Sequence, residues 1–574
     1  MIDYFFWKLN VRGYHLTNIV LHIAAALSVY WLVNVIFHNN LLSLLTGIFF
    51  VIHPVHTEAV TYISGRADSL ALLFMMLSFV FYTKIASTKP FGAFARMTLC
   101  YTLALLSREN SLILPALILA YHCSFKTKVP AKRFLSLLIL AGVYLAVRVS
   151  VLHIAGTPNA SATTLGQRLP GIFVAMTTYL RLLVLPLNLH MEYGNRISAW
   201  SNPKALLGII LVAALLTYAF KRRNQDRLIF FSILWFAAAL LPVSNLYPLN
   251  AFMAEHWLYL PSIGFFLIVA NGLCSFYNTN KFKFLTAVSA VGLSLLYSYI
   301  TVKQNSYWRE PMRFYERTLK YAPDSSRLYN NLGTAYNAIH EKEKAIEAYK
   351  RAIELNANYA DAYYNLANIY DDQNKAAEAI AAYTKAVFLA PHNADAYTNL
   401  GNAYEAVHKM PEAIVSYKKA IEFDPGHVEA YNNLGRVYQR MNKNEEAIAA
   451  YKEAIKINPG YAMVYYNLGI VYQAMNRLEE AKAAYKTAIN IKNDYLEAYN
   501  NLGNISRGTH KNQEAIASYK KIIEIDPNYA MAYSNLAIIY FEEQQYELAI
   551  EYFDKGKALG FTNPALLEAL RPYR

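Results

Sequence analysis

The sequence predicts an all-α protein in two parts: a polytopic helical membrane domain over residues 1–303, followed by a helical solenoid over residues 304–574. Two observations predict this division. Up to residue 303, long apolar runs alternate with short basic loops, and this stretch holds 23 Lys and Arg but seven carboxylates. From residue 304 onward a pattern recurs every 34 residues, and 31 Lys and Arg nearly balance 33 carboxylates. Such contrasting halves indicate separate domains.

Eight apolar runs in the first part are long enough, at about 20 residues, to cross a bilayer as helices. They cover residues 15–37, 41–60, 68–83, 134–153, 204–220, 228–246, 257–276 and 283–303. The stretch 97–124 is interrupted by the polar residues 107–110 and by Pro115, which predicts two short helices joined by a polar turn. Residues 171–187 carry Arg181 in mid-run, so a spanning helix and a helix along the interface both remain open.

Four basic loops set the predicted orientation, because Lys and Arg gather on the cytoplasmic side of membrane proteins. They hold Lys84, Lys89 and Arg96; Lys126, Lys128, Lys132 and Arg133; Lys221, Arg222, Arg223 and Arg227; and Lys281 and Lys283. All four share one side if 97–124 crosses twice and 171–187 does not cross, which gives about ten spans. The second part then lies on the non-cytoplasmic face, in the ER lumen, the periplasm or the cell exterior. Since these cations punctuate apolar runs, a nucleic-acid partner is not expected.

The repeat in the second part combines three columns of residues. A leucine, a tyrosine and an alanine each recur with a period of 34 residues, and small residues such as Ala allow paired helices to approach closely. The columns are Leu332, Leu366, Leu400, Leu434, Leu468, Leu502 and Leu536; Tyr329, Tyr363, Tyr397, Tyr431, Tyr465, Tyr499 and Tyr533; and Ala345, Ala379, Ala413, Ala447, Ala481, Ala515 and Ala549. This pattern is that of tetratricopeptide (TPR) repeats. It predicts seven full repeats and a partial one, stacked into a superhelical rod with a concave groove.

An asparagine precedes each leucine of the repeat. The column is Asn331, Asn365, Asn399, Asn433, Asn467, Asn501 and Asn535. An amide side chain both donates and accepts hydrogen bonds, so such a column is able to hold an extended polypeptide by its backbone. It resembles the asparagine ladder in the TPR domain of O-GlcNAc transferases, which implies a peptide-binding groove. The alternative is that these asparagines only tie adjacent helices together.

Four stretches of the first part carry a further resemblance. They are YHLTNIVLHIAAAL, FVIHPVHTEAVTYISGRADSL, LALLSREN and LLPVSNLYPLNAFMAEHWLYLPSIGF. Together with the repeats, they resemble the transmembrane and TPR repeat-containing O-mannosyltransferases, members of the GT-C glycosyltransferases. The resemblance implies transfer of a sugar from a polyprenyl- or dolichyl-phosphate donor to Ser or Thr of a protein, on the non-cytoplasmic face. It implies the bilayer, the lipid-linked sugar and an extended polypeptide as partners.

This chemistry selects candidate residues. A hydroxyl nucleophile needs a carboxylate base, and a leaving phosphate is suited to bidentate binding by Arg. Catalytic candidates are Glu58, Asp68, Glu255, His53 and His56, and substrate-binding candidates are Arg66, Arg108, Glu109, Arg148, Arg181, His256 and Tyr259. The two histidines, three residues apart, could bind sugar hydroxyls or a metal, but this spacing alone is a weak signal. No metal site is therefore assigned, the lipid-phosphate-linked sugar is the expected donor substrate, and the need for a divalent metal is left open.

One departure from the family pattern concerns the start of the sequence. GT-C enzymes carry a key catalytic Asp in the first outer loop, after a first transmembrane helix, and this sequence is expected to lack both. A late start, a fragment and a degenerate protein are the three readings of this departure. The chain as written is therefore expected to be inactive in sugar transfer. The alternative function is that of a non-catalytic, membrane-anchored TPR scaffold.

Overall fold

The computed structural model describes residues 7, 10–62, 65–84, 90–150, 164–190, 192–193, 198–246 and 253–574. Within these residues the protein contains helices and no strand, so the predicted all-α fold class is confirmed. Contacts group the chain into two compact units, Met1–Ala335 and Tyr336–Arg574. The division by composition at residues 303 and 304 stays a prediction.

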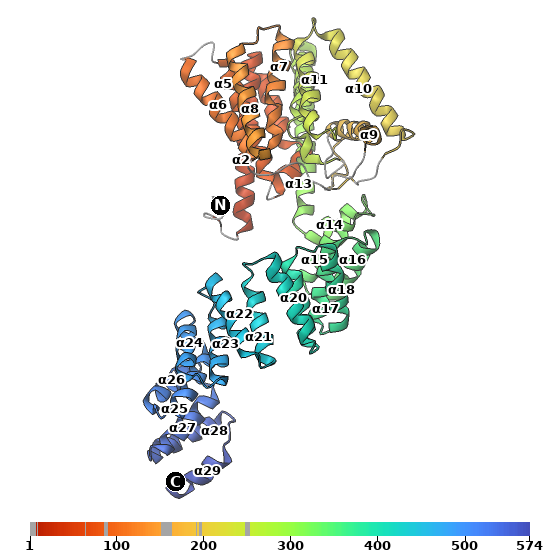
Figure 1. The fold of residues 1–574 in the computed structure, drawn as a ribbon. Coiled ribbons are helices and arrows are strands. Elements are labelled where there is room, and N and C mark those ends of the chain that lie inside the picture. The colour runs from red at the N-terminus through yellow and green to blue at the C-terminus, as the bar shows by residue number, and fades with distance from the viewer. Residues whose placement is uncertain are drawn as a thin grey trace. The chain divides into compact units, whose positions relative to one another are not determined.

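The helices of the first unit surround one large apolar core (Figure 1). Its largest fully buried side chains include Trp235, Tyr101 and Phe79. The α-helices are α2 Val11–Phe37, α3 Asn40–Ile52, α4 Thr57–Thr61, α5 Arg66–Lys84, α6 Pro90–Ser107, α7 Leu114–Phe125, α8 Ala131–Ser150, α9 Leu165–Val184, α10 Pro203–Arg222, α11 Arg227–Leu240, α12 Ser262–Tyr277, α13 Lys283–Trp308 and α14 Pro311–Leu319.

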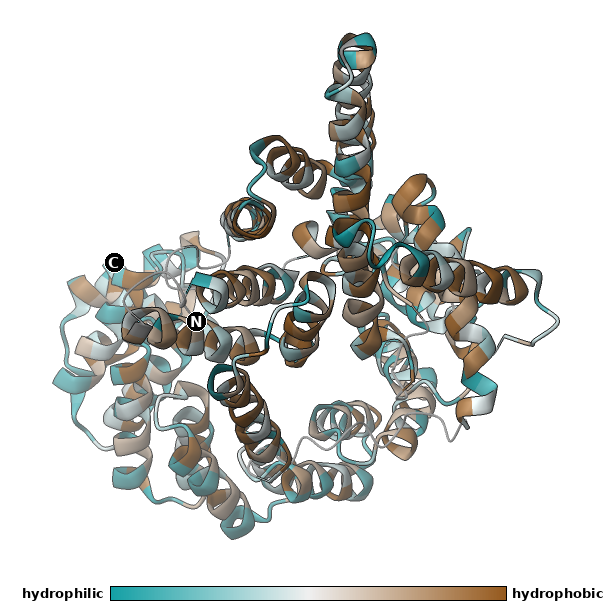
Figure 2. Ribbon diagram, turned by 90° about the horizontal axis from the view of Figure 1, so that it is seen from above, coloured by the Kyte–Doolittle hydropathy of each residue, from teal (hydrophilic) through white to brown (hydrophobic). Residues whose placement is uncertain are grey.

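Among the described residues, five helices are long and apolar enough to cross a membrane: α2, α5, α8, α10 and α13. Several of them expose large apolar side chains, such as Phe284 at 83% and Phe220 at 62%. Figure 2 shows long hydrophobic stretches along single helices, whereas other ribbons alternate hydrophobic and hydrophilic residues. Exposed apolar surface on this scale fits contact with lipid. The first unit is therefore a membrane domain, and the number of ten spans stays a prediction.

The predicted span over residues 41–60 is bent, as a broken span or a re-entrant loop would be. Helix α3 ends at Ile52, and the chain resumes after a bend of 52° in the segment Pro54–Thr61. Pro54 is the physical reason, because proline lacks an N–H group and forces the preceding residue into an extended conformation. His53 accordingly has φ −70° and ψ 127°.

The stretch 97–124 forms two helices, as predicted. Helix α6 ends at Ser107, a 3-10 helix covers Glu109–Ile113, and α7 begins at Leu114. Residues 171–187 lie mostly within α9, which packs against α10. In Figure 1, α9 runs across the direction of α5, α8 and α11, as a helix along a membrane interface would.

From α15 onward, helices alternate in the regular pairs expected of the repeat. They are α15 Ser326–Ala338, α16 Lys342–Leu355, α17 Ala360–Asp372, α18 Ala376–Leu389, α19 Ala394–Ala406, α20 Met410–Phe423, α21 Val428–Arg440, α22 Asn444–Ile457, α23 Ala462–Ala474, α24 Leu478–Ile491, α25 Leu496–Gly508, α26 Asn512–Ile525, α27 Ala530–Glu542, α28 Tyr546–Ala558 and α29 Pro564–Leu570. The seven leucines and seven alanines of the repeat are all buried, which confirms the solenoid.

Candidate functional site

Glu58 and His256 meet in the first unit although they are 198 residues apart in sequence. Glu58 lies in the short helix α4, which the bend at Pro54 creates, and His256 lies in the 3-10 helix Glu255–Leu258. The His256 backbone N–H donates to Glu58 Oε2 at 3.0 Å, and its ring Nδ1 lies 2.9 Å from Oε1. Burial by itself would lower the pKa of His256, but the carboxylates of Glu58 and Asp68 raise it. The charged pair is therefore favoured.

A second ion pair, between Asp68 and Arg108, adjoins the first. Asp68 lies in the first turn of α5, and Arg108 lies in extended backbone between α6 and the next 3-10 helix. Asp68 interacts electrostatically with both Glu58 and His256. A small cavity of about 30 Å³ is lined by Asp68, Arg108, His256 and their neighbours, including Trp257 and Tyr259. The cavity is large enough for about one water molecule.

Glu255 points away from this cavity into the interior of the unit. It is 2% exposed, and its Oε1 accepts hydrogen bonds from the His190 backbone N–H at 2.6 Å and the Tyr193 hydroxyl at 2.5 Å. Burial, and next the charge of Glu58, raise the pKa of Glu255 well above its usual range. The side chain is therefore held as a neutral acid close to the Glu58–His256 pair.

His190 and Tyr193, which support Glu255, and the nearby Glu192 were not predicted from the sequence as part of the site. The His190 ring stacks on Tyr193 at 4.0 Å and on Tyr321 at 4.5 Å between ring centroids. Glu192 accepts hydrogen bonds from Ser325 at 2.8 Å and Arg327 at 3.0 Å. The one sequence signal for this segment was Glu192 itself, a carboxylate in the acid-poor half of the chain.

His53, His56 and Tyr259, three of the predicted site residues, are each hydrogen-bonded to other protein groups. His53 Nε2 lies 3.1 Å from the Leu183 carbonyl, and His56 Nε2 lies 3.0 Å from the Ser262 hydroxyl. The other ring nitrogens of His53 and His56 also contact the backbone. Tyr259 contacts His22 at 2.6 Å and Ser69 at 3.0 Å. The rings of His53 and His56 are thus both hydrogen-bonded to protein groups. The described residues contain no cluster of three or more His, Cys, Asp or Glu suited to a metal ion.

Of the predicted phosphate-binding arginines, Arg108 lines the cavity. Arg66 lies over the Tyr14 ring at 5.3 Å, and Arg181 donates to the Leu187 carbonyl at 3.2 Å. Arg148 contacts Glu109 at 3.5 Å, at a position where the Glu109 side chain is 53% exposed. The structure therefore gathers Glu58, Asp68, Arg108, His256 and Tyr259 around one place, with Glu255 behind them, and the roles of all these residues remain proposals.

The asparagine column lies along the first helices of successive repeats. Several of its amides donate to the preceding repeat: Asn433 to Asn402 at 2.9 Å and Asn467 to Asn432 at 2.9 Å. Asn399 donates to Tyr364 and to Asn368, both at 3.2 Å. These amide N–H groups tie adjacent helices together. The oxygen of Asn433 is also engaged, since it accepts from the Asn432 amide at 3.3 Å. The column therefore has a structural role between repeats, and peptide binding by it stays a proposal.

Comparisons with known proteins agree with these observations. Tetratricopeptide repeat families match residues 360–393, 392–460, 429–494 and 494–559, and a TPR repeat family matches 341–374. Protein O-mannosyl-transferase F38B6.6 of Caenorhabditis elegans is 27% identical over 58% of this chain and 49% of its own length. TMTC3 of Mus musculus is 26% identical over 61% of this chain and 42% of its own.

The chain is similar to named TMTC protein O-mannosyl-transferases. A further relative, TMTC1 of Homo sapiens, is 26% identical over 61% of this chain and 46% of its own length. The chain thus spans about half the length of the curated TMTC relatives it matches. Two solved TPR structures also align: YrrB, 24% identical with a TM-score of 0.30 over 32% of this chain and 95% of its own, and MamA, 31% identical with a TM-score of 0.28 over 29% and 97%.

Proposed function

We propose that the protein is a membrane glycosyltransferase that transfers a sugar from a polyprenyl- or dolichyl-phosphate donor to Ser or Thr of a polypeptide. Mannose is the proposed sugar. One observation carries the proposal: two neighbouring carboxylates in a membrane domain are each paired with a cation, and Asp68, Arg108 and His256 of these pairs line one cavity. Carboxylates in such surroundings are costly and tend to serve a function. The similarity to named O-mannosyl-transferases supports the same reaction class.

Arg108 is the proposed ligand of the donor phosphate. Its present partner is Asp68, and a phosphate arriving at the cavity would compete for the same guanidinium. Binding of the phosphate would release the Asp68 carboxylate, which would then accept the proton of the acceptor hydroxyl as that oxygen attacks the sugar carbon. The bond from the sugar carbon to the phosphate oxygen breaks, and Arg108 stabilises the charge that develops there.

Glu58 and His256 are proposed to shape the other side of the site. The backbone N–H and ring Nδ1 of His256 fix the direction of the Glu58 side chain. Glu58 is then available for hydrogen bonds to sugar hydroxyls. Glu255 acts through this pair as a positioning residue, since the same 3-10 helix carries both Glu255 and His256.

The solenoid is proposed to hold the acceptor polypeptide on the non-cytoplasmic side. Amide groups of the asparagine column would exchange hydrogen bonds with the backbone of an extended chain, which imposes little sequence preference. This arrangement would raise the local concentration of acceptor hydroxyls beside the membrane.

A transfer assay tests this function in the protein reconstituted in liposomes with lipid-phosphate mannose and Ser/Thr peptides. Asp68→Asn should lower kcat by about 10²- to 10⁴-fold, as loss of a general base does. Asp226→Asn is the matched control, because Asp226 caps α11 by accepting from the Ile229 N–H and Asn caps equally well. Equal activity in both variants, or no transfer by the wild type, would favour the non-catalytic scaffold.

A further inference from the structure

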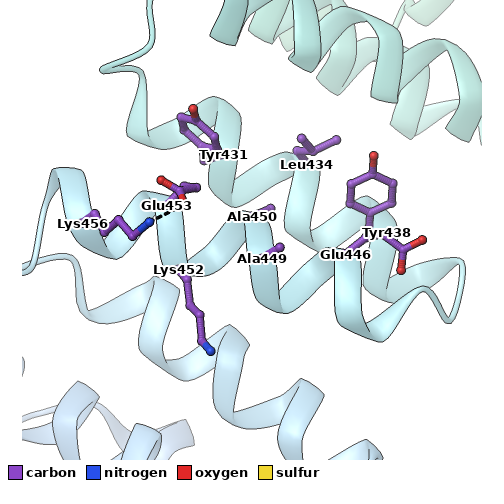
Figure 3. Close-up of a pocket in the computed structure, with 9 residues that line it drawn as sticks. All are labelled: Tyr431, Leu434, Tyr438, Glu446, Ala449, Ala450, Lys452, Glu453 and Lys456. Carbon is purple, nitrogen blue, oxygen red and sulfur yellow. Dashed lines mark hydrogen bonds and ion pairs between the residues drawn. The ribbon is translucent and has the colours of Figure 1, made fainter.

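The solenoid carries a pocket of about 510 Å³ between α21 and α22 (Figure 3). Leu434, Ala449 and Ala450 give it an apolar floor, and the rings of Tyr431 and Tyr438 stand at its sides. A volume of this size lies within the range of about 300–1,000 Å³ that is typical of ligand sites. It is sufficient for a large apolar side chain of a partner.

This pocket lies on the opposite side of α21 from the asparagine column. Tyr431, Leu434 and Tyr438 are three and seven residues apart, so they share one face of the helix. Asn433 and Arg436 are three residues apart and share another face, from which they reach Asn402 and Glu405 of the preceding repeat. The pocket is therefore separate from the surface proposed to hold the acceptor.

Lysines dominate one position of the second helices of the repeats. The lysine column consists of Lys350, Lys418, Lys452, Lys486 and Lys520, all exposed, and Thr384 and Asp554 take the other two places in the series of seven. Lys452 lines the pocket itself, and the ammonium group of Lys418 lies 6.0 Å from the centroid of the Tyr438 ring. A column of like charges spaced by one repeat favours an extended anionic partner.

The acidic residues near the pocket offset only part of this charge. Of the two glutamates that line it, Glu453 is paired with Lys456 at 2.6 Å, as Figure 3 shows. On the preceding helix, Glu422 is likewise paired with Lys419 at 2.8 Å. The other lining carboxylate, Glu446, is balanced in number by Lys452, so the excess positive charge comes from Lys418 and the rest of the lysine column.

Exposed apolar side chains continue from the pocket onto the preceding helices. Val415 of α20 holds the same repeat position as Ala449 and is 61% exposed. Phe388 of α18 is 73% exposed, with the Lys385 ammonium group 5.2 Å from its ring centroid. Apolar groups bordered by lysines are unusual on a fully solvated surface and indicate a contact site.

We propose that this surface, opposite the asparagine column, docks an acidic amphipathic segment of a partner polypeptide. The segment places an apolar side chain in the pocket and its carboxylates against the lysine column. A pocket with side walls favours an inserted side chain over the flat layer of head groups that an anionic membrane presents. The solenoid would thereby bind two polypeptides on opposite faces, and this second site does not depend on the proposed transfer reaction.

The test measures binding of a fluorescein-labelled, Glu-rich peptide with a Phe/Leu face to the full chain in zwitterionic nanodiscs. Replacing each Glu of the peptide by Gln should weaken binding at least about tenfold, and so should Lys418→Glu with Lys452→Glu in the protein. Lys418→Arg with Lys452→Arg keeps the charge and should stay within about twofold. Ala449→Trp should fill the pocket and weaken binding at least about fivefold.

Two outcomes overturn the proposal. Equal affinity for the Glu and Gln peptides would show that the lysines do not select the partner, and unchanged affinity in both Lys418→Glu/Lys452→Glu and Ala449→Trp would place the site elsewhere. Binding of phosphatidylserine vesicles without binding of the peptide would assign the surface to lipid. Circular dichroism of each variant identifies loss of fold. If the reversal variant does not fold, the Glu-to-Gln peptide still tests the role of charge on the unaltered protein.

Discussion

His256 binds Glu58 at two points, through its backbone N–H at 3.0 Å and its ring Nδ1 at 2.9 Å. The contact joins a short helix after the second apolar run to the segment before α12, so it fixes two distant parts of the membrane domain to each other. Glu255, the residue before His256, is held from behind by Tyr193 and His190. The geometry of the candidate site therefore depends on this one 3-10 helix.

Stability is predicted to fall as pH rises above neutrality. The folded pKa of His256 is raised above its ordinary value of about 6.5, so its stabilisation is complete below that pH and is lost as pH rises through the raised pKa. Glu255 acts with the same sign, because the folded protein keeps its proton after the unfolded chain has lost it. Thermal unfolding in detergent, measured from about pH 5.5 to about pH 9, checks this trend.

Glu255→Gln is the matched variant for that measurement. The amide keeps an oxygen that accepts from Tyr193 but has no proton to lose, so its unfolding temperature should depend less on pH than that of the wild type. Two results would contradict the assignment of a neutral side chain at Glu255. The wild type would gain stability toward about pH 9, or the unfolding temperature of the variant would depend on pH as steeply as that of the wild type.

Tyr193→Phe should destabilise the membrane domain by about 1–3 kcal/mol, since a buried carboxyl group loses one of its donors. Tyr218→Phe is a suitable control because Tyr218 is 42% exposed on α10. Denaturation in mixed micelles compares the two variants. If both lose the same stability, the hydroxyl of Tyr193 has no special part in holding Glu255.

Gly435→Ala should destabilise the solenoid by about 1–3 kcal/mol through overpacking. A Cβ at this position would lie 2.6 Å from the Tyr451 ring, which is itself fully buried. Gly508→Ala provides the contrast, because no atom lies within 4 Å of the added carbon. Urea unfolding followed by circular dichroism should show a loss for Gly435→Ala and no loss for Gly508→Ala; a loss of equal size in both would rule out the packing argument.

Replacing Asn399, Asn433 and Asn467 together with Ala should weaken binding of an unfolded polypeptide while the helix content stays the same. The structure adds a stability cost of about 0.5–1.5 kcal/mol for each lost inter-repeat hydrogen bond. Fluorescence anisotropy with an unfolded Ser/Thr-rich peptide measures the affinity, and only a mild salt dependence is expected because the repeats are nearly neutral. Unchanged affinity would leave the asparagines with the structural role alone.

The solenoid was predictable from sequence because its contacts are local and periodic. Leu400 and Ala413 are buried for the same reason as their counterparts one repeat away. The candidate site was predictable only as a set of residue types. A spacing of three residues between His53 and His56 does not reveal that both rings turn toward backbone partners, and no local pattern brings Glu58 to His256. Such contacts depend on how distant helices pack.

Photo-crosslinking of the lipid-phosphate sugar to the cavity of Asp68 and Arg108 tests most directly whether the donor binds there. A benzophenone side chain replaces Trp257, which lines this cavity, and in a control protein it replaces the exposed Trp200. Labelling by the donor lipid is predicted at position 257, with competition by unlabelled lipid-phosphate mannose and loss in Arg108→Gln. Equal labelling at both positions, or labelling that neither the competitor nor Arg108→Gln reduces, would contradict the account.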